Sequence, residues 1–235
     1  MILLEARGLE RSFGPLRAVD GISFSLEAGE SLTVFGPNGA GKTTLLSLLG
    51  GGLRPTAGEV RIGGEALDPS EGEWRGRIGV LSHQGFLYGH LTAAENLRFY
   101  ADLYGIPWRE AVPGALARVG LEARADSRVR TFSRGMRQRL ALARTLLHDP
   151  ELVLLDEPYT GLDAHAAAVL REVLGALRDG RRTVVMVTHN LAEGLELADR
   201  VAIQVRGRFV HLAPAATARS EDFARFYLDA VEAAG

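Results

Sequence analysis

GPNGAGKT, residues 36–43, is the stretch that decides the fold. The apolar run ESLTVF before it (30–35) reads as a buried strand, and TTLLSLLG (43–50) reads as a short helix. A G-x-x-x-x-G-K-[ST] segment in this context predicts a loop whose backbone N–H groups turn inward around phosphate oxygens. The start of the helix adds a partial positive charge. We therefore expect a nucleotide phosphate site between a strand and a helix of an α/β fold.

Lysine is almost absent from this chain. Its 27 Lys and Arg residues include a single lysine, Lys42, at the end of the glycine-rich loop. A compact ammonium fits between phosphate groups better than a planar guanidinium, so Lys42 is expected to reach the β- and γ-phosphates, with the Thr43 hydroxyl on Mg²⁺. An incidental lysine in a glycine-rich turn is the alternative, and a dinucleotide fold would lack the Lys-Thr pair. The expected site comprises Gly36, Pro37, Asn38, Gly39, Ala40, Gly41, Lys42, Thr43 and Thr44.

Two carboxylates end the apolar run LVLLDEP, residues 152–158. Ligands bind at the carboxyl ends of strands in open α/β sheets, so Asp156 is placed to hold Mg²⁺, directly or through water. Glu157 is placed to polarise the attacking water as a general base, a role typically worth about 10²–10⁴-fold in rate. The alternative is a strand that ends in an acidic turn.

Gln84 and His189 also follow buried strands, IGVLSH and VVMVTH. Both strands are expected to end at the same edge as Asp156. A glutamine amide there would contact Mg²⁺ and the water, and a histidine would bond the γ-phosphate. The alternative for both Gln84 and His189 is that they are ordinary polar residues in the turn after a strand. The other histidines show no metal-ligand spacing.

Composition narrows the class of protein. The 235 residues are 46% hydrophobic and 24% charged, with a net charge of -2 and no cysteine. This balance supports a buried core and excludes disulfides, thiolate catalysis and cysteine-bound metals. No basic excess indicates a nucleic-acid partner. The beginning MILLEARGLERSF does not resemble a signal peptide, and no apolar run approaches the roughly 18 residues of a membrane span.

Strand and helix patterns alternate on either side of a helical block. Strand-like runs occupy residues 1–35 and recur at GEVRIGG (58–64) and RIGVLSHQ (77–84), and strand and helix alternate again from 151, with helices expected over 164–179, 191–197 and 220–234. From about 85 to 148 the pattern is helical, with a capping box at Thr92 and Glu95 and a helix broken around Pro113-Gly114. We expect a single domain over residues 1–235. Residues 1–84 and 149–235 would form the α/β core with its β subdomain, and 85–148 an inserted helical subdomain.

A second candidate anion site lies in TFSRGMRQRL, residues 131–140. Ser133 is placed as the N-cap of a helix whose apolar stripe is Met136, Leu140, Ala143 and Leu147. Ser133 and Gly135 leave the helix start open to close approach, as at anion-binding helix starts. This segment lies some ninety residues after the phosphate loop, so the sequence raises the question of what a second anion site is for.

The ordered set of motifs resembles the nucleotide-binding ATPase subunit of ATP-binding cassette (ABC) transporters over almost the whole chain. The order is the phosphate loop, Gln84, FSRGMRQ, LLDEP, GLD at 161–163 and His189. In FSRGMRQ, Arg134 replaces a glycine and Met136 a glutamine of the family signature. The resemblance implies an α/β P-loop NTPase fold with a mostly parallel sheet core, an N-terminal antiparallel β subdomain and an inserted helical subdomain. It also implies ATP and Mg²⁺ as ligands.

The resemblance implies partners as well. In the family two subunits pair head to tail, and the signature of one covers the γ-phosphate held by the other. Ser133 and Gly135 would have that role in a homodimer or with a close paralogue. Asp163 would lie on the dimer seam or cap the next helix, and Phe13 would stack on adenine or belong to the core. Polytopic membrane subunits would dock near Gly85–Leu91, which places the chain at the cytoplasmic face of the inner membrane as a peripheral subunit.

The sequence leaves alternatives open for the exported compound and for the class of ATPase. The sequence over residues 80–105 and 133–150 is similar to that of haem exporters of cytochrome c maturation, and also to that of ABC-2 type exporters of drugs, lipids or polysaccharides. A soluble ABC ATPase that acts on ribosomes or DNA is a rival class, although no long coiled coil and no second cassette is present. A P-loop kinase or GTPase would leave the Ser133 segment unexplained.

Overall fold

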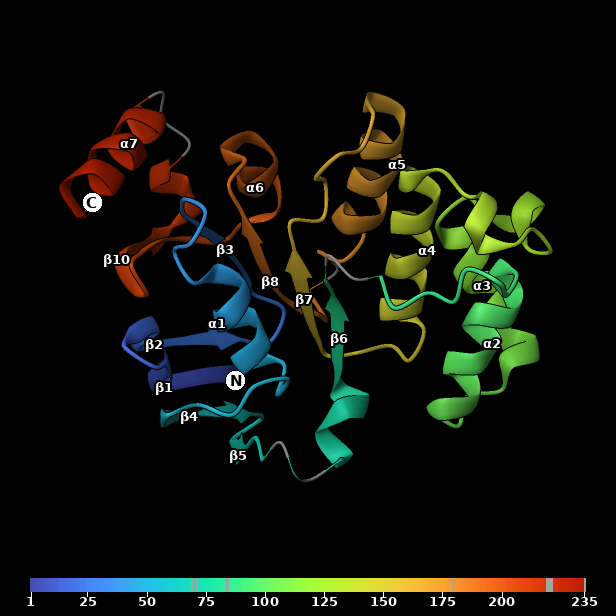
Figure 1. The fold of residues 1–235 in the computed structure, drawn as a ribbon, viewed down its shortest axis with the longest axis horizontal. Helices are drawn as coiled ribbons and strands as arrows, with labels where there is room; N and C mark the ends of the chain where they lie inside the picture. The colour runs from blue at the N-terminus through green and yellow to red at the C-terminus, as the bar shows by residue number, and fades with distance from the viewer. Residues whose placement is uncertain (69, 71, 83–84, 179, 219–221, 235) are drawn as a thin grey trace.

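A six-stranded sheet carries the phosphate loop, and a second, four-stranded sheet lies beside it (Figure 1). The computed structural model describes every residue except 69, 71, 83–84, 179, 219–221 and 235. The strands are β1 (Ile2–Phe13), β2 (Leu16–Glu27), β3 (Ser31–Phe35), β4 (Ala57–Ile62), β5 (Glu65–Ala66), β6 (Ile78–Leu81), β7 (Leu152–Asp156), β8 (Thr183–Thr188), β9 (Arg200–Val205) and β10 (Arg208–Pro214). The α-helices are α1 (Lys42–Leu49), α2 (Ala93–Leu103), α3 (Trp108–Arg118), α4 (Arg134–Leu146), α5 (Ala164–Gly175), α6 (Leu191–Leu197) and α7 (Asp222–Ala234).

The six-stranded sheet has the order β10-β9-β3-β8-β7-β6, and all its strands run parallel except β10. Parallel strands are covered on both faces, which explains why β3, β7 and β8 are buried throughout. The four-stranded sheet has the order β2-β1-β4-β5 with antiparallel pairs. The expected fold, an α/β P-loop core with an N-terminal antiparallel β subdomain, is confirmed.

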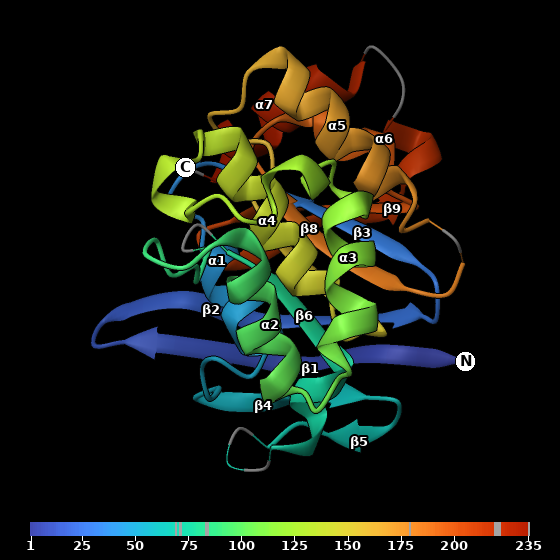
Figure 2. The same ribbon diagram turned by 90° about the vertical axis from the view of Figure 1, so that its right-hand side faces the viewer.

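Alternate residues of the central strands face two different cores, as the two-residue period of a strand requires. On β7, Leu152 and Leu154 pack against α1 and the antiparallel sheet, so α1 lies between the two sheets. On the same strand, Val153 and Leu155 pack against the side of α4 and α5. Figure 2 shows β1, β2 and β4 on one side of the six-stranded sheet and α5 and α6 on the other.

Helices α2, α3 and α4 lie together at one end of the molecule (Figure 1). The expected capping box starts α2, because the Thr92 hydroxyl accepts the N–H of Glu95 and the Glu95 carboxylate accepts the N–H of Thr92. The break expected around Pro113-Gly114 is wrong, since α3 runs through Pro113. Proline there removes only one backbone hydrogen bond, and the burial of Val112 and Leu116 on either side holds the helix.

The helices α5 and α6 can also be compared with their expected bounds. Helix α5 ends at Gly175, four residues before the expected end, while α6 spans the expected 191–197. At the other end of the molecule from α2, Phe223 of α7 packs its ring on Phe35, the last residue of β3, with centroids 6.0 Å apart. In the part of the chain that the structure describes, no helix is long and apolar enough to cross a bilayer.

Candidate nucleotide-binding and catalytic site

The site forms where several parallel strands end at one edge of the sheet. The register pairs Phe35 of β3 with Thr188 of β8, and Asp156 of β7 with Val187 of β8. Each of these strands therefore delivers its next residues to the same place: the phosphate loop after β3, Glu157 after β7 and His189 after β8. The carboxyl edge of a parallel sheet is the usual ligand-binding edge of such folds.

The backbone of the phosphate loop leaves no room for side chains at two of its glycines. A Cβ atom on Gly36 would lie 2.3 Å from the carbonyl oxygen of Gln204, and one on Gly41 would lie 1.9 Å from that of Ala18. Gly41 also has φ 97° and stands as the N-cap of α1 without a capping side chain. The first turn of α1 thus opens directly on to the loop, which suits it to an anion.

Lys42 is folded back over the loop. Its ammonium donates to the carbonyl oxygens of Gly36 at 2.7 Å and Pro37 at 3.1 Å, and the residue is only 7% exposed. Burial lowers the pKa of the Lys42 ammonium from its ordinary value, and the nearby Glu157 and Asp156 carboxylates raise it. A buried ammonium this close to the loop amides is positioned for phosphate oxygens.

Thr43 and Asp156 meet at the start of α1. The Thr43 hydroxyl donates to the Asp156 carboxylate, at 3.1 Å from Oδ2 and 3.3 Å from Oδ1, and Asp156 is 4% exposed. This pair gives a hydroxyl and a carboxylate oxygen at one point beside the phosphate loop. Oxygen donors of this kind fit Mg²⁺, which is bound by few protein ligands and by phosphates of the nucleotide. Thr43 and Asp156 are thus the residues that would hold the ion.

Glu157 occupies a strained and strongly bonded position. Its φ of 48° lies in the left-handed region, although its N–H still donates to the carbonyl oxygen of Val187 at 2.9 Å. One carboxylate oxygen accepts the Thr188 hydroxyl at 3.0 Å, and the other lies 2.8 Å from Nδ1 of His189. Backbone strain of this kind concentrates at functional sites. The carboxylate and the imidazole, both expected from sequence, are thus brought into direct contact.

A cavity of about 670 Å³ joins these groups. Its lining includes Asp156 and Glu157 from the end of β7 and Phe13 from the end of β1, and its volume suits a nucleotide. Phe13 is 45% exposed and therefore not a core residue. The guanidinium of Arg11 lies 4.8 Å from the centre of its ring and covers one side of it. The cavity is lined by Phe13, Leu16, Arg17, Ala18, Asn38, Gly39, Ala40, Gly41, Lys42, Thr43, Thr44, Asp156, Glu157 and Arg206.

Comparison with known proteins agrees with this geometry, because residues 19–160 match the family described as ABC transporter. This chain belongs to the ABC transporter family. Nod factor export ATP-binding protein I of Ralstonia nicotianae is 38% identical over 209 residues, which are 88% of this chain and 65% of that protein. Linearmycin resistance ATP-binding protein LnrL of Bacillus subtilis is 36% identical over 211 residues, 88% of this chain and 68% of that protein. The chain thus spans about two thirds of the length of these relatives.

The fold comparison points to the same family. The structure of cbiO1 from Clostridium perfringens, described as part of the ABC transporter complex cbiONQ, superimposes with a TM-score of 0.83 and 25% sequence identity. The match covers 97% of this chain and 94% of cbiO1. The arrangement of two sheets and inserted helices is therefore that of an ABC ATP-binding subunit.

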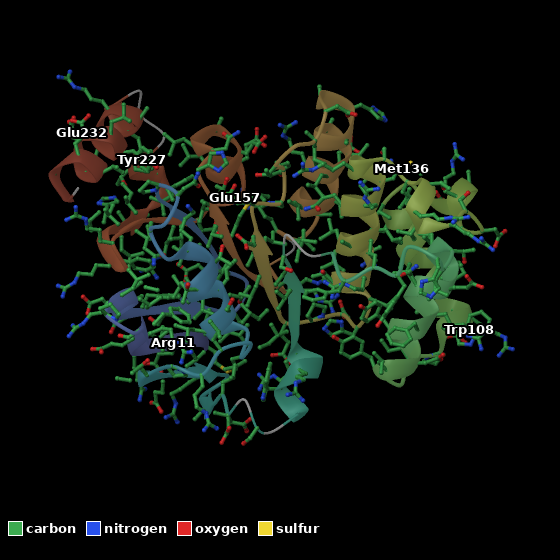
Figure 3. The ribbon with its side chains drawn as sticks, viewed as in Figure 1. Arg11, Trp108, Met136, Glu157, Tyr227 and Glu232 are labelled. Carbon is green, nitrogen blue, oxygen red and sulfur yellow. The ribbon has the colours of Figure 1, made fainter. Side chains whose placement is uncertain are left out.

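Two signature residues, Ser133 and Gly135, do not line the phosphate-loop cavity, whereas Arg134 and Arg137 line a second cavity with Asp156 and Glu157. Figure 3 places Glu157 near the centre and Met136 on α4, toward the end of the molecule where α2 and α3 lie. Ser133 is the N-cap of α4, with its hydroxyl accepting the N–H of Met136 at 3.2 Å. Gly135 is buried against α5, where a Cβ atom would lie 2.6 Å from that of Ala166. Neither Ser133 nor Gly135 is among the described residues that line the cavity.

The GLD segment touches the signature within one chain. A Cβ atom on Gly161 would lie 2.3 Å from Cζ of Arg134, so the arginine that replaces a signature glycine packs on this segment. Asp163 caps α5, and its carboxylate accepts the N–H of Ala166 at 2.8 Å. The capping role is thus seen directly, and the role on a dimer seam stays a prediction. Gln84, the remaining expected site residue, lies outside the described residues.

Sequence reasoning missed part of the cavity. Arg17 and Ala18 come from the start of β2, and Arg206 comes from the turn between β9 and β10. Thr188, whose hydroxyl bonds Glu157, was also missed, although a polar residue directly before His189 at a strand end was a usable signal. Arg206 had a weaker signal, since Arg-Gly between two apolar runs indicates only a hairpin turn.

Proposed function

We propose that this chain is the ATP-hydrolysing motor subunit of an ABC exporter, and that it closes on a second ATPase subunit when ATP binds. The observation that carries the proposal is the cavity lined by Lys42, the Thr43–Asp156 pair and Glu157, whose carboxylate in turn contacts His189. These groups match, in type and place, what a phosphate chain, a magnesium ion and an attacking water require.

The proposed chemistry follows from the positions of the side chains. Lys42 and the loop amides neutralise the charge that spreads over the phosphate oxygens during transfer. Magnesium, when bound with ATP, supplies further neutralisation at the Thr43–Asp156 pair. Glu157 accepts a proton from the attacking water as general base, and His189, 2.8 Å away, orients its carboxylate and contacts the γ-phosphate. Gln84 is proposed to contact the ion and the water.

The position of Ser133 outside the phosphate-loop cavity supports a composite site. Ser133 lies at an N-terminus of a 13-residue helix but lines no wall of the cavity that holds its own phosphate loop. A second subunit placed head to tail would bring Ser133 and the Gly135 N–H on to the γ-phosphate of the partner. ATP would then hold two chains together, and hydrolysis would release them. This answers why one chain has two anion sites.

The segment near Gly85–Leu91 is proposed as the place where membrane subunits dock. Phe86 is 53% exposed and Tyr88 is 41% exposed, which is unusual for large apolar rings. Aromatic side chains with polar tips suit such interfaces, because they bury a large area and keep a hydrogen bond. The chain would thus work at the cytoplasmic face of the inner membrane as a peripheral subunit.

The proposal extends to the class of compound that the transporter exports. One relative is named for export of Nod factor and another for resistance to linearmycin, and neither name mentions haem. These names favour a drug, lipid or polysaccharide exporter over a haem exporter of cytochrome c maturation. The membrane subunits that co-purify with this chain from detergent extracts, and the compound whose export stops without them, identify the cargo. Co-purification of ribosomes or DNA instead would contradict the exporter proposal.

The nucleotide part of the proposal is tested with Lys42→Ala. Removal of the ammonium leaves phosphate charge uncompensated at the buried loop, so we expect tight ATP binding and hydrolysis to be lost. Calorimetric titration with ATP and a phosphate-release assay measure the two effects. Arg54→Ala, which removes a side chain that is 67% exposed and pairs with Asp68 outside the cavity, is the control. Near-normal ATP affinity of folded Lys42→Ala protein would contradict the assignment.

A further inference from the structure

The turn between β9 and β10 has a residue that its backbone does not favour. Two residues connect the strands, Arg206 with φ 46° and Gly207 with φ 82°. A two-residue hairpin with positive φ at both positions is a type I′ turn, for which Asn-Gly and Gly-Gly are the preferred sequences. A long side chain such as arginine is uncommon in this region and costs conformational energy. The formation of the turn therefore does not explain why an arginine occupies position 206.

This turn is fixed to the nucleotide site by its backbone. The N–H of Gly207 donates to the carbonyl oxygen of Ala40 in the phosphate loop at 3.0 Å. The carbonyl oxygen of Gly207 accepts the N–H of Asp20 in β2 at 2.9 Å. A Cβ atom on Gly207 would lie 2.9 Å from the carbonyl oxygen of Arg17. The turn is thus held between the phosphate loop and the segment that follows Phe13, and its position is set before any ligand arrives.

Three arginines gather here, and their contacts differ. Arg17 and Arg208 both donate to the carboxylate of Asp20, at 3.3 Å from Nη1 of Arg17 and 2.7 Å from Nη2 of Arg208. Arg206 is exposed and lines the cavity with Phe13, Leu16 and Ala18. Phe13 ends β1, and Leu16 and Ala18 begin β2, so these neighbours belong to the β1–β2 hairpin, whereas Asp156 ends β7. Arg206 therefore lines the cavity beside the hairpin that carries Phe13.

We propose that Arg206 is a nucleotide-binding residue that contacts the nucleoside of ATP opposite Phe13. The planar guanidinium stacks on aromatic faces, and a base held between Phe13 and Arg206 is covered on both sides. Arg11 covers one side of the Phe13 ring, which leaves the other side for the base. This inference rests on the proposed binding of ATP in the cavity. It adds a residue to the site and assigns a function to the unfavoured turn.

The turn geometry makes a sharp test possible, because the substitution that removes the contact also suits the backbone. Arg206→Asn gives Asn-Gly, the preferred type I′ sequence, so the protein should be as stable as the wild type or more so. We expect the dissociation constant for ADP to rise about two- to fivefold. Arg206→Lys, which keeps the positive charge but replaces the planar guanidinium by an ammonium, should show a similar rise in the dissociation constant. Calorimetric titration with ADP and a thermal melt of each protein measure these effects.

Arg208→Asn is the matched control. It removes the same positive charge two residues further along the chain, from a side chain that bonds Asp20. Its ADP affinity should stay at the wild-type value. Unchanged affinity in Arg206→Asn would overturn the proposal, and so would full affinity in Arg206→Lys, which would indicate a simple charge on phosphate. An equal loss in Arg208→Asn would also overturn it. Wild-type protein that binds no ADP would instead refute the nucleotide site as a whole.

Discussion

At the scale of single residues, Glu157 is the proposed general base, and its contacts suggest a variant that keeps the shape of the side chain. A glutamine in its place retains an oxygen for the Thr188 hydroxyl, bonded at 3.0 Å in the wild type, but cannot take a proton from water. We expect Glu157→Gln to bind ATP and to hydrolyse it about 10²–10⁴-fold more slowly. With hydrolysis slowed, an ATP-dependent dimer should accumulate, which size-exclusion chromatography with and without ATP measures.

A nearby carboxylate provides the control for this variant. Glu193 lies on the first turn of α6, and burial raises the pKa of its carboxyl group from the ordinary value. Glu193→Gln removes the same negative charge without removing a group that lines the cavity, so it should hydrolyse ATP and give no persistent dimer. A Glu157→Gln protein that stays monomeric at high concentration, with ATP binding confirmed, would count against the proposed role of Glu157.

At the scale of elements, the segment 85–91 before α2 is held by its backbone and exposes the rings of Phe86 and Tyr88. The N–H and carbonyl of Tyr88 both bond the buried amide of Asn96, at 2.8 Å and 3.0 Å, and the Tyr100 hydroxyl bonds the carbonyl of Phe86. Truncation of the exposed rings should therefore leave the loop in place. We expect Phe86→Ala with Tyr88→Ala to bind ATP and to lose assembly with the membrane subunits, measured by co-purification beside a thermal melt.

Phe226→Ala is the matched control, because Phe226 is also a partly exposed aromatic residue, 43% accessible, but lies on α7. It should assemble normally. Normal assembly and transport by the double variant would place the docking surface elsewhere. A much lower melting temperature of the double variant would instead show that Phe86 and Tyr88 stabilise the helical block, as the edge-on contact of Tyr88 with Phe99 at 5.1 Å would allow.

At the scale of the whole molecule, the two anion sites of one chain are expected to serve two different nucleotides. Ser133→Arg should spare ATP binding to the single chain and abolish hydrolysis, because a bulky cation at the helix start blocks the γ-phosphate of the partner. Lys42→Ala should also abolish hydrolysis, but by preventing ATP from binding to its own phosphate loop. Mixed in equal amounts, the two variants should form heterodimers with one intact site, and phosphate release should exceed that of either variant alone. Full ATPase activity in the Ser133→Arg homodimer would show that the signature helix does not face nucleotide.

Local patterns predicted where most side chains of the candidate site lie, and long-range contacts account for the placements that they missed. The phosphate loop, Asp156, Glu157 and His189 follow from strand ends, because parallel strands deliver their next residues to one edge. The placement of Arg206 depends on a hairpin that bonds a loop more than 160 residues earlier, which no local pattern reports. Pro113 was misread for a similar reason, since burial of its neighbours, rather than the proline itself, decided that α3 continues.

The pairing of β3 has a consequence for how the protein is made. Phe35, the residue before the phosphate loop, pairs with Thr188 on one side and Ile203 on the other, and Phe223 covers its ring. These neighbours leave the ribosome long after Phe35, so the phosphate loop has no complete sheet beside it until synthesis has passed residue 203. Contacts so distant in sequence slow folding and leave apolar strands exposed in the meantime. A nascent chain stopped before β9 should therefore be unable to retain ATP, however complete its glycine-rich loop.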